Sequence, residues 1–354
     1  MGKKYNITIL KGDGIGPEVV AQGVKVLEAI EERFDLQFHK TYADFGGVAI
    51  EKFGQPLPEE TLADCLKADA ILLGAIGLPK YDNNPAYPIR PEQGLLELRK
   101  KLGLFTNIRP VKSYDALADL SPLKSDRLAE LDFVIYRELT GGIYFGKKEL
   151  DLEAGEAYDV CRYDKNEISR IARIAFAAAE NRNKKLTLVD KANVLATSQL
   201  WRHTVGIVAK DFPNVKLEHL YVDNAAMQII LNPKQFDVIL TSNMFGDILS
   251  DEASILSGSL GLLPSASIGE KTALFEPCHG SYPEGAGKDL ANPVATILSV
   301  AMMLDYLQAF EAAQSIREAV NDALNKQEGT IDLFGKDGLS CSTVGNSIAQ
   351  HITT

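Results

Sequence analysis

Cysteine is scarce in this sequence, and what there is stands far apart. The 354 residues contain only Cys65, Cys161, Cys278 and Cys341. None of them belongs to a CxxC motif or to a cluster with histidine, so the sequence gives no support for a zinc site. The same spacing argues against a disulfide framework and favours reduced thiols, as expected of a cytoplasmic protein.

Long hydrophobic runs are also missing. The most continuous one, Val294–Leu304, has about half the length that a helix needs to cross a bilayer. Met1–Asn6 leads directly into the short apolar segment Ile7–Leu10, without the pattern of a signal peptide. We therefore expect a cytoplasmic protein that has no membrane partner.

Positive charge is in deficit. The chain has 37 Lys and Arg against 48 Asp and Glu, which gives a formal net charge of −11, and it has no long basic run. Such a protein repels phosphate backbones, so we expect no nucleic-acid partner. An anionic substrate would have to be bound by a few arginines concentrated in one place. The hydrophobic share of 45% and the length are typical of a globular protein of two domains.

The sequence shows no internal repeat, and strand-like apolar segments alternate with helical patterns. The predicted strands are Asn6–Leu10, Ala68–Gly74, Asp132–Arg137, Leu186–Asp190, Val215–Tyr221 and Asp237–Thr241. The predicted helices are Gly16–Phe34, Glu59–Leu66, Lys165–Asn181, Asn193–Asp211, Ala225–Leu231, Gly246–Leu256, Pro293–Leu307 and Glu311–Asn325. This alternation predicts an α/β fold with helices covering a mainly parallel sheet. Gly141–Tyr163, which is richer in Gly, Tyr and charge, predicts an antiparallel excursion or arm.

A glycine-rich turn, Lys11–Glu18 (KGDGIGPE), lies between the first predicted strand and helix. Such a turn brings backbone N–H groups and a helix N-terminus close to an anion or a cofactor. Its spacing is GxGxGP rather than GxGxxG, and no acidic residue ends a second strand about twenty residues later. The motif therefore gives only weak support for a Rossmann site, and a tight structural turn explains it as well.

Three arginines on separate elements could bind a small acid with two carboxylates. Arg99 lies on a helical segment, Arg109 follows Phe105–Ile108, and Arg137 ends a predicted strand. A guanidinium group donates two parallel hydrogen bonds to a carboxylate. Any single arginine is more often a solvated surface residue. Arg137 is harder to explain in that way, because sites of α/β folds gather at strand ends.

Lys191 stands at the C-terminal end of a buried strand. A lysine that is partly desolvated there can act as a base. Equally, Asp190 could cap the following helix while Lys191 faces water. The residues alone leave both interpretations open.

Two aspartates, Asp247 and Asp251, are four residues apart and therefore share one face of a predicted helix. Their mutual repulsion predicts a divalent cation, Mg²⁺ or Mn²⁺, between them. A solvated acidic face is the alternative, which the apolar neighbours Phe245 and Ile248 disfavour. Asp223, after another predicted strand, is a further candidate ligand.

The Gly- and Pro-rich segment Leu274–Pro293 holds a His, a Glu and an Asn before a strong helical pattern. A loop of this length is often functional, and its backbone could wrap a nucleotide. It could also be a mere connection.

Together these five motifs, in this order and across nearly the whole chain, resemble the β-hydroxyacid oxidative decarboxylases, the isocitrate and isopropylmalate dehydrogenase family. The resemblance implies a non-Rossmann α/β fold of two domains with a central cleft. It places residues 1–104 and 258–354 in a cofactor-side domain and residues 105–257 in a domain for dimerisation, metal and substrate. It also implies a homodimer with shared active sites.

By this resemblance, the substrate is a 2-hydroxy dicarboxylate that is oxidised with NAD and then loses carbon dioxide. Arg99, Arg109 and Arg137 would bind its carboxylates. The partner subunit's Lys191 would assist removal of the hydroxyl proton, and Tyr144 would protonate the enol carbon as a general acid.

The resemblance also assigns the cofactors. Asp247, Asp251 and the partner subunit's Asp223 would bind Mg²⁺ or Mn²⁺, with Asp223 also near the substrate. NAD would be bound by Ile15, Glu276, His279, Gly280, Ser281, Glu284, Gly287 and Asn292. The carboxylate of Glu284 would repel a 2′-phosphate and thus select NAD over NADP.

The segment Glu92–Leu96 resembles the one that recognises an alkyl group in the isopropylmalate branch of the family. Glu92 would belong to the substrate site, and Leu95 and Leu96 would form its apolar wall. The expected reaction converts 3-isopropylmalate into 4-methyl-2-oxopentanoate in leucine biosynthesis. The alternatives are a sibling enzyme for D-malate, tartrate or homoisocitrate, a non-catalytic regulatory subunit, and a metal-dependent hydrolase.

Overall fold

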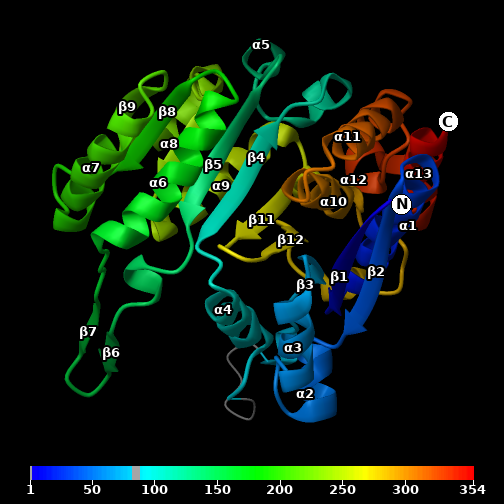
Figure 1. Cartoon of the computed structure of the whole chain (residues 1–354), viewed down its shortest axis with the longest axis horizontal. Coiled ribbons are helices and arrows are strands. Elements are labelled where there is room, and N and C mark those ends of the chain that lie inside the picture. The colour runs from blue at the N-terminus through cyan, green and yellow to red at the C-terminus, as the bar shows by residue number, and fades with distance from the viewer. Residues whose placement is uncertain (1, 82–87) are drawn as a thin grey trace. The chain divides into compact units, whose positions relative to one another are not determined.

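The computed structural model describes residues 2–81 and 88–354, which form two compact units (Figure 1). Unit 1 consists of Met1–Leu104, Tyr114–Leu120 and Ser257–Thr354. Unit 2 consists of Phe105–Ser113 and Ser121–Leu256. Unit 1 is thus built from both ends of the chain, and unit 2 from its middle.

The strands of unit 1 lie in the order β2-β1-β3-β12-β11. Their bounds are β1 (Lys3–Gly12), β2 (Leu36–Ala43), β3 (Ala70–Ala75), β11 (Pro264–Ile268) and β12 (Ala273–Pro277). β1 is parallel to β2 and β3, and β12 is parallel to β3, whereas β11 runs antiparallel to β12. Every residue of the central strand β3 is buried, because helices cover a parallel sheet on both faces.

The helices of unit 1 include one that is buried almost all round. They are α1 (Gly16–Arg33), α2 (Gly47–Phe53), α3 (Glu59–Lys67), α4 (Pro91–Leu102), α10 (Val294–Tyr306), α11 (Phe310–Asn325), α12 (Ile331–Phe334) and α13 (Cys341–Thr353). α10 contacts α1, α11 and β12, so the most apolar segment of the sequence is a core helix. In the described part of the chain, no helix combines the length and apolar character needed to span a bilayer.

The strands of unit 2 lie in the order β4-β5-β10-β8-β9. Their bounds are β4 (Thr106–Lys112), β5 (Asp132–Glu138), β8 (Lys185–Asp190), β9 (Lys216–Tyr221) and β10 (Val238–Thr241). β4 and β5 are antiparallel, and the other neighbours are parallel. The carboxyl ends of β5, β8 and β10 therefore share one edge of the sheet, where Arg137 and Lys191 stand.

Helices cover both faces of the unit 2 sheet and create two hydrophobic cores. They are α5 (Ser125–Leu128), α6 (Lys165–Glu180), α7 (Ala196–Val208), α8 (Val222–Leu231) and α9 (Asn243–Ser254). One core contains Phe176 of α6 and Trp201 of α7. The other contains Ile229 of α8 and Leu249 of α9. A separate two-stranded antiparallel hairpin, β6 (Lys148–Asp151) and β7 (Glu156–Asp159), is exposed at every residue.

The predicted mixed α/β fold is confirmed. β1, β3, β5, β8, β9 and β10 coincide with the six predicted strands to within a few residues, and the hairpin confirms the antiparallel excursion. The predicted helix Gly246–Leu256 begins three residues earlier, at Asn243. β2, β4, β11 and β12 were not among the predicted strands.

Helix α6 begins with a complete capping box, which yields a stability prediction. The Asp164 carboxylate accepts hydrogen bonds from the backbone N–H groups of Asn166 and Glu167, at 2.8 and 3.0 Å, and the Glu167 side chain accepts from Asp164 N. We expect Asp164→Ala to lower the free energy of unfolding by about 1 kcal/mol, because two N–H groups lose their partner. Asp164→Asn keeps an acceptor and is the control. Chemical denaturation measures both, and equal losses would contradict the capping role.

Candidate active site

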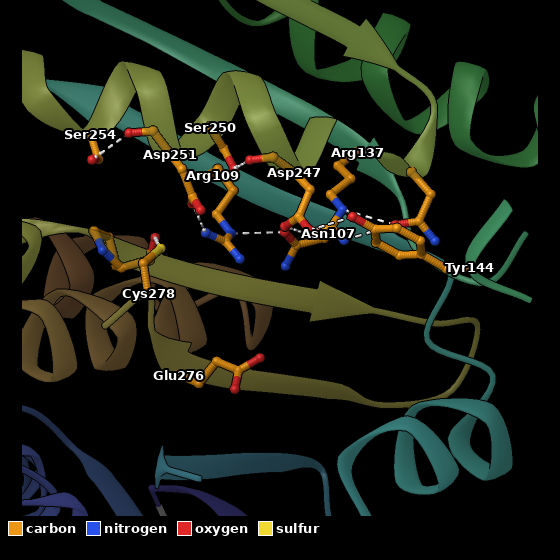
Figure 2. Close-up of polar contacts among 12 residues, drawn as sticks. Asn107, Arg109, Arg137, Tyr144, Asp247, Ser250, Asp251, Ser254, Glu276 and Cys278 are labelled. Carbon is orange, nitrogen blue, oxygen red and sulfur yellow. Dashed lines mark hydrogen bonds and ion pairs between the residues drawn. The ribbon is translucent and has the colours of Figure 1, made fainter. Parts of the chain in front are cut away.

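Arg137, at the end of β5, is the centre of a polar network in unit 2 (Figure 2). Its Nε and Nη2 atoms donate to Asn243 Oδ1 at 3.0 and 2.8 Å, and its Nη1 atom pairs with Asp247. The register of β10 against β5 explains why these side chains lie together. Thr241 of β10 lies beside Arg137, so α9 begins next to the guanidinium group. Gly246 allows this approach, because a Cβ atom there would lie 2.6 Å from Arg137 Cγ.

Tyr144 reaches the same network from the short helix η3 (Gly142–Tyr144). Its hydroxyl donates to Asp247 Oδ2 at 2.9 Å, and its ring centroid lies 5.8 Å from the Arg137 guanidinium (Figure 2). Partial burial, and then the hydrogen bond to Asp247, raise the pKa of the Tyr144 phenol. The phenol thus keeps its proton at neutral pH, as a general acid must.

Arg109 is held in a similar way on the neighbouring strand β4. Its Nε atom donates to Asn107 Oδ1 at 2.9 Å, and its Nη1 atom lies 3.8 Å from Asp251 Oδ1. Asn107 and Arg109 are two residues apart and share one face of the strand. The structure therefore brings together predicted residues Arg109, Arg137, Tyr144, Asp247 and Asp251.

Asp247 and Asp251 lie one turn apart on α9, and each is paired with an arginine. Asp251 is 75% exposed and Asp247 35%, so both carboxylates are accessible to an ion. Carboxylate oxygens are the donors that Mg²⁺ and Mn²⁺ prefer, so this pair fits such an ion. Within residues 2–81 and 88–354, no three His, Cys, Asp or Glu side chains gather as a metal site.

Lys191 and Asp223 form a separate pair. Lys191 Nζ lies 2.7 Å from Asp223 Oδ1, at the start of α8. The hydrogen bond from Lys191 lowers the pKa of the Asp223 carboxyl. Asp190 accepts a hydrogen bond from Ala192 N at 2.8 Å and pairs with Arg202, which fixes the turn that carries Lys191.

In unit 1, Arg99 of α4 pairs with Glu276 of β12 at 2.8 Å. Both side chains are mostly buried, and Arg99 Nε has no hydrogen-bond partner among the described residues. On the same helix Leu96 is 46% exposed, Leu95 packs partly against the core, and Glu92 is exposed.

The glycine-rich turn and the long Gly/Pro loop meet in unit 1 and border a cavity of about 680 Å³. Ile15 N donates to Ser281 O at 2.8 Å. Gly14 has φ +57°, and a Cβ atom there would lie 2.0 Å from Ser281 O, so the contact requires glycine. Glu18 accepts hydrogen bonds from the N–H groups of Gly287 and Asp289 and so joins the loop to α1.

The cavity combines apolar walls with a few polar groups, as nucleotide sites do. Its lining residues are Ile15, Leu260, Gly261, His279, Gly280, Tyr282, Leu290, Ala291, Asn292, Ile331 and Asp332. His279 Nδ1 lies 2.9 Å from Gly280 O and therefore carries the proton, which leaves Nε2 as an acceptor. Nε2 has no partner in the described part of the chain. Glu284 is exposed on the neighbouring short helix η8 (Pro283–Gly285).

Asn107 and Asn243, which accept hydrogen bonds from Arg109 and Arg137, were not predicted as site residues. Asn107 could have been found from its spacing of two from Arg109 on an extended segment. Asn243 is the first residue of α9, and only the pairing of β10 with β5 places it beside Arg137. No local signal in the sequence reveals that pairing.

Comparison with known proteins identifies the family. The family model described as isocitrate/isopropylmalate dehydrogenase matches residues 6–348. The chain belongs to this isocitrate/isopropylmalate dehydrogenase family. Membership confirms the resemblance that the motifs of the sequence indicate.

Two relatives are identical to this chain at slightly more than half of the aligned residues. A 3-isopropylmalate dehydrogenase of Clostridium acetobutylicum is 53% identical over 337 residues, which cover 94% of each chain. One of Pseudomonas fluorescens is 55% identical over 345 residues, 96% of this chain and 95% of the relative. The crystal structure of isocitrate dehydrogenase from Methylococcus capsulatus matches with a TM-score of 0.86 at 33% identity, covering 99% of this chain and 100% of that chain.

The environment of His279 predicts a dependence of stability on pH. Burial lowers the pKa of the imidazole below its ordinary value of 6.5. The folded state therefore binds fewer protons, so its stability is fully present above pH 6.5 and falls as the pH drops towards the folded pKa. We expect His279→Asn to reduce the loss of folding stability at acidic pH. Denaturation between pH 5 and 8, about the span over which histidine titrates, measures this loss. An unchanged pH profile in the variant would contradict a buried neutral imidazole.

Proposed function

We propose that this chain catalyses the NAD-dependent oxidative decarboxylation of 3-isopropylmalate to 4-methyl-2-oxopentanoate and carbon dioxide, a step of leucine biosynthesis. The observation that carries the proposal is the cluster of Arg137, Tyr144 and Asp247. Relatives that are 53% and 55% identical and named 3-isopropylmalate dehydrogenase support this substrate. The order of the motifs supports the same chemistry.

In the proposed site, Arg99, Arg109 and Arg137 bind the two carboxylates of the substrate. Hydrogen bonds from Arg109 to Asn107 and from Arg137 to Asn243 orient the guanidinium groups. An amide oxygen orients each guanidinium group without adding a negative charge of its own. Leu95 and Leu96 bind the isopropyl group, and the exposure of Leu96 supports this role.

Lys191 and Tyr144 are the proposed proton carriers. As hydride leaves C2, the partner subunit's Lys191 assists removal of the C2 hydroxyl proton, which produces the ketone. The carboxylate on C3 then leaves as carbon dioxide, and its bonding electrons form an enolate across C2 and C3. The Tyr144 phenol donates its proton to C3, which restores the ketone; the raised pKa keeps that proton on the phenol at neutral pH.

Asp247 and Asp251 would hold Mg²⁺ or Mn²⁺, together with the partner subunit's Asp223. When bound, the metal supplies Lewis-acid polarisation of the oxygen on C2, and NAD supplies the hydride acceptor. The two accessible carboxylates on one face of α9 support the assignment.

NAD would bind at the cavity of unit 1. Ile15, His279, Gly280 and Asn292 line that cavity, and Ser281 is hydrogen-bonded to Ile15. The polar side chains of His279 and Asn292 suit the hydrogen-bonding edge of an adenine base. The resemblance further assigns Glu276, Glu284 and Gly287 to this cofactor; the N–H of Gly287 bonds Glu18, so we assign Gly287 a backbone role in shaping the loop.

A homodimer would complete each site with the partner subunit's Lys191 and the partner subunit's Asp223. Exposed apolar side chains on α8 and α9, two helices in contact, support such an interface, because neighbouring exposed apolar groups mark protein–protein contacts. These side chains are Met227 and Leu231 of α8 and Ile248 of α9. In this proposal, unit 1 is the cofactor-side domain and unit 2 the dimerisation and metal domain.

The decisive assay is NADH production from 3-isopropylmalate, with D-malate, tartrate and homoisocitrate as competing substrates. We expect the highest kcat/KM with 3-isopropylmalate, because an apolar wall gives the alkyl group its binding energy. EDTA should abolish the signal, and added Mg²⁺ or Mn²⁺ should restore it. A preference for D-malate would refute the substrate, and full activity in EDTA would refute the metal.

Lys191→Ala tests the proposed base. We expect kcat to fall by about 10²-fold or more, because general catalysis by one side chain contributes that much. NAD affinity, measured by calorimetry, should stay nearly unchanged, since Lys191 belongs to unit 2. Lys165→Ala, an exposed lysine on α6, is the matched control. Normal kcat in Lys191→Ala would rule out the role.

A further inference from the structure

Tyr282 holds an unusual backbone conformation at the edge of the unit 1 cavity. Its φ and ψ are 37° and 66°, in the left-handed region that side-chain-bearing residues rarely adopt. The neighbouring backbone keeps it there: Ser281 O accepts from Ile15 N at 2.8 Å, and Tyr282 O accepts from Gly285 N at 3.0 Å. A strained residue that its surroundings hold in place points to a function for its side chain.

Gly285 forms the surface on which the Tyr282 ring lies. A Cβ atom at position 285 would stand 2.3 Å from Tyr282 Cε1 and 2.5 Å from Cδ1, closer than real Cβ atoms come to other atoms. Gly285 is buried, whereas Tyr282 is 54% exposed. The ring is therefore packed against the glycine and remains accessible to a ligand. Any side chain at position 285 would displace it.

The exposed ring lines the same cavity as His279 and Asn292, and the aliphatic side chains of Ile15, Leu260 and Leu290 line it too. We propose that Tyr282 is an aromatic platform on which the adenine base of the dinucleotide stacks, and that Gly285 is the positioning residue that fixes the ring. Every nucleobase has a π face, so a ring exposed in this way suits a planar base better than it suits a sugar or a phosphate. The inference deepens the proposed function and rests on its nucleotide site.

The platform accounts for the strain. Glycine at position 282 would adopt the left-handed conformation freely but would present no surface to a base. A tyrosine there lowers the stability of the loop and gains an aromatic contact. The role therefore predicts that stability and nucleotide affinity change in opposite directions when Tyr282 is replaced by glycine.

Binding of ADP-ribose to the whole chain, measured by isothermal titration calorimetry, tests this without turnover. We expect Tyr282→Gly to weaken binding about tenfold, the scale of one lost base–aromatic stack, while its melting temperature equals or exceeds that of the unmodified chain. Tyr282→Phe keeps the ring and should bind within about twofold. Phe53→Ala, which removes an exposed aromatic outside the cavity in unit 1, is the control and should bind normally.

A double-mutant cycle tests the role of Gly285. Gly285→Ala should weaken ADP-ribose binding in the unmodified chain, because the added methyl group displaces the ring. In the Tyr282→Gly background the same substitution should have little effect, since no ring is left to move. Additive losses would overturn the positioning role.

Three results would overturn the proposal in different ways. Unchanged ADP-ribose affinity in Tyr282→Gly, with normal binding by the unmodified chain, would refute the platform and leave the proposed function standing. Absence of binding by the unmodified chain would refute the nucleotide site itself and the platform with it. A melting temperature that falls together with the affinity would show that the tyrosine is structural.

Discussion

The candidate site of unit 2 depends on one buried cation. Arg137 is only 6% exposed, and its guanidinium group is held by Asn243, Asp247 and the ring of Tyr144. A buried charge without partners is costly, so each element that supplies a partner is constrained by the arginine. The first turns of α9 and the turn that ends at Tyr144 are fixed in this way. The residues that carry the proposed chemistry are thereby ordered before any ligand binds, which lowers the entropic cost of catalysis.

The sequence predicted the fold where the apolar pattern was strong and local. β3 has six buried residues in a row and was predicted as a buried strand. α10 is apolar on almost every face and was predicted as a helix. β4 was missed because Arg109 and Pro110 interrupt its pattern, and β11 because its small polar residues are buried only by their neighbours. Strand propensity reflects such surroundings more than it reflects the residue itself.

The site was predictable as a set of residues but not as a set of contacts. The spacing of Asp247 and Asp251 alone places them on one helix face. In the structure, ion pairs with Arg137 and Arg109 reduce the predicted repulsion between the two carboxylates. The partners Asn243 for Arg137 and Ser281 for Ile15 lie 106 and 266 residues away in the chain (243 − 137 and 281 − 15). Contacts over such distances follow from strand order and loop packing, which one sequence does not display.

Unit 1 is built from separated stretches of the chain, and this affects the order of folding during synthesis. β3 pairs with β12 through Ile71 and Leu274, so the sheet of unit 1 stays incomplete until residues beyond 256 have left the ribosome. Every strand of unit 2 has by then been made. Domains fold as units while the chain emerges, so the middle of this protein can fold first. Its N-terminal hundred residues meanwhile leave the β3 edge unpaired, and an unpaired edge can pair with another chain.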